Sequence, residues 1–227
     1  MTEWRALRGW SSGALREKID RLSTSRNFTT PDEDMIGERG WHHYYSEAVI
    51  AREPEGDAHF ARAREALVNY QFSDPAIVVA HFDPAAPLLG RRILLEIKVL
   101  GLRYLCPAQV SLIRDEPGVY GFRYDTLVGH IEQGVEWFLL SKDEKGDIRF
   151  RIEARWQEGD LPNWWSRIGF RLVASRYQRR WHIEAHRRLS RLAHGGPARR
   201  PRRDEAGLTH QGVDVTFTWH TKRKWML

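Results

Sequence analysis

Hydrophobic and polar positions follow two different periods along this chain, and each period predicts a type of element. Apolar residues recur every three or four positions over Phe170–Leu192, which predicts a long helix with one apolar face. Shorter stripes of the same period predict helices over Gly13–Leu22 and Ala58–Tyr70. Short apolar runs bounded by turn residues predict six consecutive strands, over Ile77–Phe82, Arg91–Leu100, Tyr104–Arg114, Val119–Leu127, Gly134–Ser141 and Ile148–Trp156.

The order of these elements predicts an α+β fold. Six strands at hairpin spacing with no helix between them are typical of an antiparallel meander. His43–Ala51 reads as an earlier strand, and Val213–His220 alternates cleanly enough to predict a last one. A long helix with one apolar face needs a large surface to cover, so we expect a curved antiparallel sheet wrapped around the long C-terminal helix.

This reading divides the chain into three parts. We expect an N-terminal extension over 1–42, the folded domain over 43–194, and a basic linker with the C-terminal strand over 195–227. The last strand could add to a sheet edge in its own chain or in a second copy, which makes Val213–His220 a candidate homodimer contact.

Composition narrows the class of protein. Hydrophobic residues make up 41% of the chain, enough to form a core and to exclude a wholly disordered protein. The single cysteine, Cys106, excludes an intramolecular disulfide and a multi-thiolate zinc site, and we expect it to be an inert core thiol. The chain has charged residues near its start and no apolar run of the ~20 residues that a membrane span requires. We therefore expect a soluble, cytoplasmic protein without a transmembrane segment.

Charge is distributed unevenly. Residues 164–227 contain 15 Lys and Arg against 4 Asp and Glu, whereas the preceding part of the chain has a net charge of −5. A basic C-terminal third can bind an anionic partner such as nucleic acid or a lipid surface, or it can be a solvated helix face followed by a tail. The residues that would contact such a partner are Arg199, Arg200, Arg202 and Arg203.

The segment from Tyr124 to Phe138 carries the most specific signature, YDTLVGHIEQGVEWF. It resembles the motif Y-G-T-L-x-G-H-x-E-x-G-E-E-x-F of a bacterial and plant family, domain-of-unknown-function family nineteen-ninety. Asp125 and Val135 stand where the family has Gly and the first Glu of its pair. The positions that fit are Tyr124, Thr126, Leu127, Gly129, His130, Glu132, Gly134, Glu136 and Phe138. The resemblance extends to about residue 192 and implies no activity.

The element order from about residue 43 to 192 also resembles the helix-grip architecture of the Bet v 1/START-like superfamily. That resemblance implies an apolar cavity between the sheet and the terminal helix.

Within the signature, Gly129 and Gly134 can take the positive φ angles of a tight connection, which would present His130 and Glu132 at the end of the sheet. Glu136 shares a strand face with apolar side chains, so its carboxylate needs a partner or a proton.

Three interpretations of this cluster remain open. His130 and Glu132 could lock the turn while Glu136 pairs with His130 or with an arginine of the terminal helix, Arg171 or Arg176. They could instead form the polar end of a cavity. They could also perform general acid–base chemistry, with Tyr124 as a proton donor.

No cofactor or metal is expected from the remaining motifs. The chain has no nucleotide or phosphate loop, no G-x-S-x-G and no C-x-x-C. His182 and His186 are spaced i, i+4, but we expect them to be exposed on an arginine-rich helix face. We expect Trp164 and Trp165 to pack the helix start against the sheet, with a cavity lid as the alternative.

The leading functional hypothesis is therefore the binding of a hydrophobic small molecule between the sheet and the terminal helix. The alternatives are an enzyme of the hydrolase or cyclase type using His130 and Glu136, and an anionic-partner protein. The predicted ligand-binding residues are Tyr124, Thr126, His130, Glu132, Glu136, Phe122, Phe138, Leu140 and Trp181.

Overall fold

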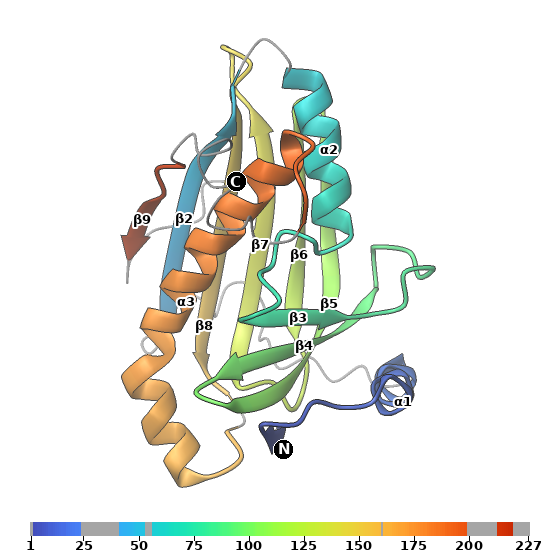
Figure 1. The fold of residues 1–227 in the computed structure, drawn as a ribbon, viewed down its shortest axis with the longest axis vertical. Helices are drawn as coiled ribbons and strands as arrows, with labels where there is room; N and C mark the ends of the chain where they lie inside the picture. Colours follow the sequence, from blue (N-terminus) through green and yellow to red (C-terminus); the bar gives the residue numbers. More distant parts are fainter. Residues whose placement is uncertain (1, 24–40, 53–55, 160, 199–212, 220–227) are drawn as a thin grey trace.

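The computed structural model describes residues 2–23, 41–52, 56–159, 161–198 and 213–219. Within these ranges the chain forms one antiparallel sheet and three helices (Figure 1). The helices are α1 (Ser12–Ser23), α2 (Gly56–Val68) and α3 (Trp164–Ala193). The strands are β1 (Glu3–Ala6), β2 (His42–Ala51), β3 (Val78–His81), β4 (Arg92–Val99), β5 (Leu102–Glu116), β6 (Val119–Thr126), β7 (Glu132–Lys142), β8 (Ile148–Glu158) and β9 (Thr216–Trp219).

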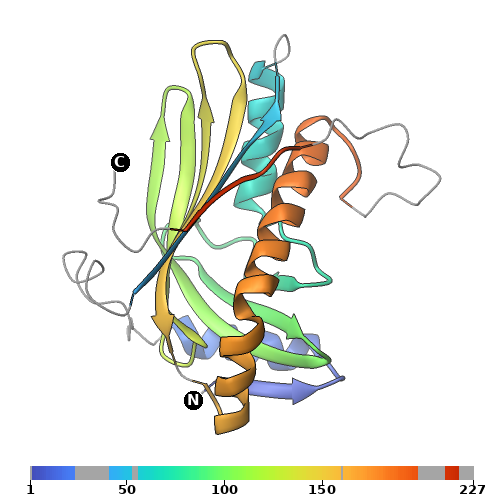
Figure 2. The same cartoon turned by 90° about the vertical axis from the view of Figure 1, so that its left-hand side faces the viewer.

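The sheet confirms the predicted meander. Its strand order is β3-β4-β5-β6-β7-β8-β2-β9, so the six consecutive strands are neighbours in space, and every pairing is antiparallel. Figure 2 shows that α2 and α3 lie on the same face of the sheet. The sheet curves around α3, and the predicted α+β helix-grip fold is confirmed.

Helix α3 begins and ends at recognisable capping signals. Asn163 has extended backbone angles, and its Oδ1 accepts a hydrogen bond from the Ser166 amide at 2.8 Å. The helix stops at His194, after which Gly195 takes a φ of +74° and its amide donates to the Leu192 carbonyl.

The apolar stripe of α3 serves two purposes along its length. In the C-terminal half, Trp181, Ala185 and Leu189 are buried in the core. In the N-terminal half, Phe170 and Tyr177 are only half-buried. The helix therefore packs tightly at one end and stands above a space at the other.

The main core lies between the sheet and the two helices. Phe72, which follows α2, contacts Phe138 of β7, Phe150 of β8 and Trp181 of α3, with ring centroids 4.9–6.2 Å apart. Aromatic side chains contribute a large share of buried apolar area, so this cluster fixes α3 against the sheet.

The N-terminal segment joins the sheet, which the sequence pattern did not indicate. β1 pairs with β5, and Trp10 and Leu15 form a second small core with Leu94 and Leu105. All four residues of β1 are exposed, so the strand has no alternation by which a sequence pattern could reveal it.

The predicted C-terminal strand is confirmed over Thr216–Trp219, whereas residues 213–215 are described and lie outside any strand. β9 pairs with the edge of β2 in its own chain, with Tyr45 opposite Thr218 and Glu47 opposite Thr216. His220, the last residue of the predicted strand, lies outside the described residues. A homodimer through this segment stays a prediction.

Candidate functional site

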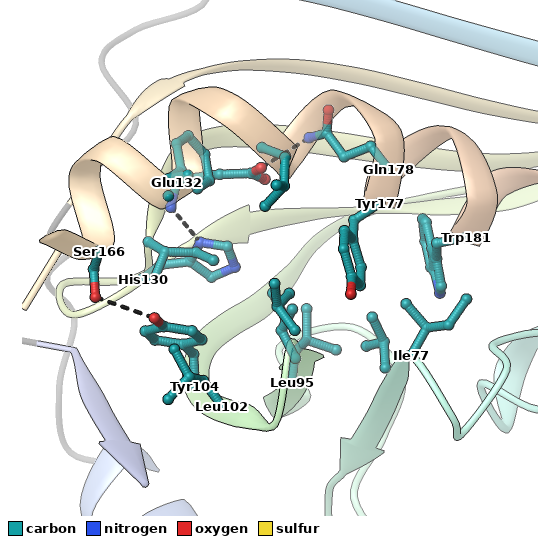
Figure 3. A pocket seen from close by; sticks show the side chains of 18 of the residues that line it. Ile77, Leu95, Leu102, Tyr104, His130, Glu132, Ser166, Tyr177, Gln178 and Trp181 are labelled. Carbon is teal, nitrogen blue, oxygen red and sulfur yellow. Dashed lines mark hydrogen bonds between the residues drawn. The ribbon is translucent and has the colours of Figure 1, made fainter. Parts of the chain in front are cut away.

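A cavity of about 280 Å³ lies beneath the N-terminal half of α3 (Figure 3). Its floor comes from β4 and β5, its inner wall from β6 and β7, and its roof from α3. Ile77, Leu95 and Leu102 face Tyr177 and Trp181 across it. Its volume is near the lower end of the ~300–1,000 Å³ range of ligand pockets, and most of its lining is apolar.

The start of α3 and the β4–β5 turn border the cavity. Tyr104 of β5 and Ser166 of α3 share a hydrogen bond of 3.1 Å between their hydroxyls (Figure 3). Trp165 lines the cavity and meets Trp4 edge-on at 5.1 Å. Trp164 is 74% exposed, so the expectation that both tryptophans pack the helix onto the sheet is wrong for Trp164.

The two glycines of the signature are required for different structural reasons. Gly129 takes a φ of +97°, as expected for the turn between β6 and β7. Gly134 does not need a positive φ, which corrects our expectation; a Cβ atom there would lie 2.0 Å from the Arg155 carbonyl oxygen of β8. The Gly134 amide donates to Thr126 Oγ1 at 2.9 Å, which holds the two ends of the turn together.

The His130 imidazole is buried in the cavity wall. Its Nδ1 accepts a hydrogen bond from the Glu132 amide at 2.9 Å, and its side chain projects into the cavity (Figure 3). Burial lowers the pKa of His130 to about 4, so the ring is neutral at pH 7. Because Nδ1 is the acceptor, the proton of the neutral ring is on Nε2. Nε2 has no hydrogen-bond partner among the described residues.

This tautomer can be measured directly. We expect the ¹⁵N spectrum of His130 to show the Nε2–H form at pH 7 and no titration above about pH 5, because charging the buried ring is unfavourable. A His130 ring that gains its proton near pH 6.5 would contradict this assignment.

Glu132 reaches the cavity from the start of β7. Its Oε1 accepts a hydrogen bond of 2.8 Å from Gln178 Nε2 of α3 (Figure 3). Desolvation raises the pKa of Glu132 to about 7, and the Gln178 hydrogen bond acts in the opposite direction. This carboxyl group is therefore divided between its charged and neutral forms near neutral pH.

Glu136 is buried in the same wall, four residues further along β7 and on the same face of the strand. Tyr124 of β6, directly opposite in register, donates its hydroxyl to Glu136 Oε2. The other oxygen, Oε1, is 3.8 Å from His182 Nε2 of α3. Desolvation raises the pKa of Glu136 to about 8, and the charge of Glu132 adds to that effect.

The partners of Glu136 differ from those expected. The carboxyl group meets Tyr124 and His182 rather than His130, because the His130 ring is turned toward the Glu132 amide. Arg176 is exposed, and the side chain of Arg171 lies outside what the structure describes.

His182 and His186 are buried, and the expectation that they are exposed is wrong. Both face β2, where Ser46 Oγ is 2.7 Å from His182 Nδ1 and 2.9 Å from His186 Nε2. One hydroxyl can donate to only one of these rings, so the other ring must donate to the hydroxyl. Glu136, His182, Ser46 and His186 therefore form a polar cluster beneath α3.

Two sequence signals could have revealed this polar cluster. Residues 182 and 186 lie next to the buried positions Trp181 and Ala185 of the apolar stripe. Ser46 occupies an inward position of β2 between Tyr44 and Ala48, which alternate with half-buried neighbours.

The nine predicted ligand-binding residues separate into two groups. Five line the cavity, namely Tyr124, His130, Glu132, Glu136 and Trp181. The other four do not line it: Phe122, Phe138 and Leu140 lie deeper in the main core, and Thr126 holds the Gly134 amide. Phe122, Phe138 and Leu140 lie on the inward face of β6 and β7, in the part of the sheet that α2 covers rather than beside the cavity.

The described lining of the cavity contains carboxyl groups and histidines but no Arg or Lys. Across the described ranges, no group of three or more His, Cys, Asp or Glu residues is arranged to hold a metal ion. Burial raises the pKa of the Cys106 thiol far above its ordinary value, which agrees with an inert core residue.

The basic C-terminal third is only partly described. Arg199, Arg200, Arg202 and Arg203 lie outside the described residues, and an anionic partner for them stays a prediction. Several arginines of α3 have partners within the chain: Arg167 pairs with Glu158, and Arg188 donates to the Gln71 carbonyl. No helix in the described residues is both long and apolar enough to cross a membrane.

Comparison with known proteins places these residues in a family. The family model described as Domain of unknown function (DUF1990) matches residues 27–188. A UPF0548 protein of Deinococcus radiodurans is 33% identical over 108 residues, which cover 43% of this chain. The match spans 54% of that relative's length.

The solved structures that match this chain do so at low identity and low TM-score. The crystal structure of Ara h 8.0201 is 12% identical, with a TM-score of 0.44, and the match covers 69% of this chain and 100% of that one. The major latex-like protein 151 of Panax ginseng is 18% identical, with a TM-score of 0.35 and coverage of 65% and 98%. Likeness at this level says nothing about the ligand.

Proposed function

Because this chain belongs to the DUF1990 family, whose description carries no activity, we propose from its own residues that it binds an apolar small molecule in the cavity beneath α3. The cavity is lined mainly by aliphatic and aromatic side chains, and a few polar groups converge at one end. This combination is typical of sites for small organic ligands.

One observation supports the proposal above all. His130 lines the apolar cavity, and its buried Nε2–H has no hydrogen-bond partner among the described residues. A buried donor without a partner costs about 1–3 kcal/mol. A ligand oxygen that accepts this hydrogen bond would offset the cost and orient the molecule.

A cavity-filling substitution tests the proposal. Ala174 lines the cavity from the roof, so Ala174→Phe should occupy the space and reduce the binding of a fluorescent hydrophobic dye at least about tenfold. Ser175 is the next residue of α3 and is exposed, so Ser175→Phe is the matched control and should bind the dye as the original protein does. Equal dye binding by both folded variants would refute a ligand site here.

Proton transfer on the bound molecule is a second candidate function. It is favoured by the position of Glu136 in the cavity wall, with Tyr124 on one carboxyl oxygen and His182 near the other. A carboxyl group with a raised pKa beside a neutral imidazole can hold or accept a proton near neutral pH.

Deuterium exchange distinguishes this second candidate from binding alone. The protein would be incubated with 2-decanone in D₂O, and deuterium at the carbon beside the carbonyl would be measured by mass spectrometry. Faster incorporation than with Glu136→Gln is the expected result. Equal rates would leave binding as the function.

A further inference from the structure

We propose that the molecule held in the cavity is an apolar amine that binds as its cation. This inference rests on the proposed binding function and names the ligand class. It goes against the overall charge of the chain, which is +6 and would by itself suggest an anionic partner.

The first argument is the charge of the cavity wall. Glu132 and Glu136 both line the cavity, and among the side chains that the structure describes no lysine or arginine lines it. The two histidines of the wall cannot compensate, since burial lowers the pKa of His130 and of His182 and keeps both rings neutral. When the two carboxyl groups ionise, a positive charge is therefore needed in the cavity.

The second argument is the unused bonding capacity of these carboxyl groups. Tyr124 donates to Oε2 of Glu136, and the distance from Oε1 to His182 Nε2, 3.8 Å, exceeds a hydrogen bond. Glu132 accepts from the neutral amide of Gln178 through one oxygen. Both groups can accept further hydrogen bonds, and an ammonium group has up to three to donate.

The aromatic part of the wall supports the same conclusion. Tyr70, Tyr124 and Trp181 surround the Glu136 end of the cavity, and Tyr177 and Phe170 come from the roof. The faces of aromatic rings attract organic cations, most strongly where water is excluded. The apolar floor then accommodates the hydrocarbon part of the ligand.

His130 supplies an independent observation that points to a ligand. Its side chain is 3% exposed, it projects into the cavity, and its Nε2–H has no partner in the described part of the chain (Figure 3). A cation cannot accept this hydrogen bond, so the ligand should also carry an oxygen, as a hydroxyl, an ether or a carbonyl. Glu136 would thus bind the ammonium group of the ligand, and His130 would donate to its oxygen.

An anionic amphiphile is disfavoured by the same geometry. The carboxylate of a fatty acid would lie beside two groups of like charge, and no lysine or arginine among the described lining residues would neutralise it. A neutral apolar molecule is tolerated, because both carboxyl groups can remain protonated near neutral pH.

Binding of a cation should depend on pH. The groups that face Glu136 are Tyr124 of β6, Tyr70 after α2, His182 of α3 and Glu132 of its own strand. None of these is positively charged at pH 7, so the cation would ionise Glu136 and release a proton. Affinity should therefore rise as the pH increases from 6 to 8 and should rise less above that.

Calorimetry with three probes of equal chain length tests the inference. Decylamine, decanol and decanoate differ only in the head group, and an alkylamine stays protonated below about pH 10, like a lysine side chain. At pH 7.5 we expect decylamine to bind about ten- to a hundredfold more tightly than decanol, and decanoate to bind most weakly. Proton release should be visible with decylamine and absent with decanol.

Two variants assign the effect to the cavity. Glu136→Gln keeps the shape of the side chain and removes its charge, so it should lower the affinity for decylamine at least about tenfold and leave that for decanol within twofold. Asp57 is an exposed acid at the start of α2, and Asp57→Asn removes the same charge without effect on either probe. Thermal unfolding of each variant shows that the comparison uses folded protein.

The results separate the amine from the cavity itself. If decylamine and decanol bind equally well, or decanoate binds most tightly, the amine inference is overturned while the ligand site stands. If none of the three probes binds, the proposed function fails and the inference fails with it.

Discussion

Gly134→Ala is expected to destabilise the protein by about 4 kcal/mol or more, a large part of the ~5–15 kcal/mol that a typical domain has. The added Cβ atom would lie 2.0 Å from the Arg155 carbonyl oxygen and 2.8 Å from the Trp156 Cα atom. Both belong to the backbone of β8, so no side-chain rotation relieves the overlap. The two strands would have to separate, and they do so at the end that positions His130 and Glu132.

Urea unfolding followed by tryptophan fluorescence measures this effect. Gly169→Ala is the matched control, because an added Cβ there meets nothing within 4 Å and alanine favours the helix. That variant should gain about 0.5–1 kcal/mol. A Gly134→Ala protein with an unchanged unfolding midpoint would show that β7 and β8 can be further apart than the structure has them.

The second large effect expected is a loss of stability with rising pH, caused by Glu136. Burial raises its pKa to about 8 in the folded protein, from an ordinary value of 4.5. Between these two values the folded state keeps a proton that the unfolded chain releases, so stability falls as the pH rises through that window. One such group costs up to about 1.4 kcal/mol per pH unit.

Comparison with Glu136→Gln between pH 6.5 and 8.5 isolates this contribution. The buried histidines have lowered pKa values, so their unfavourable effect fades as the pH rises above about 6.5 and is the same in both proteins. We expect the free energy of unfolding to fall by about 2 kcal/mol over this range and to fall much less in Glu136→Gln. Glu132→Gln is the comparison variant, since it retains Glu136; Glu132 has a pKa of about 7 and adds little above that. Parallel curves for the original protein and Glu136→Gln would contradict the assignment.

Much of the fold could be predicted because its signals are local. Turn residues separate the six strands of the meander, and each strand carries enough apolar residues to be recognised. The apolar stripe of α3 extends over many turns, which distinguishes a long helix from any alternative. β1 escaped prediction because four exposed residues carry no periodic pattern.

The candidate site was predictable only in part. Alternation along β7 places Glu136 on the inward face, and the signature directs attention to His130 and Glu132. The same alternation places Phe138 on that face without showing that α2 covers it. Sequence spacing does not show which part of a strand is packed against a helix and which part lines a cavity.

The sequence by itself determined the order of the six-stranded meander, the long terminal helix and the family, since each depends on residues that are neighbours in the chain. Only the tertiary structure decided that His182 lies between Ser46 and Glu136, and that His130 turns away from Glu136. Residues 46, 136 and 182 come from three elements far apart in the chain. The contacts among them depend on how the sheet curves and where α3 crosses it, and packing of the whole core sets that curvature.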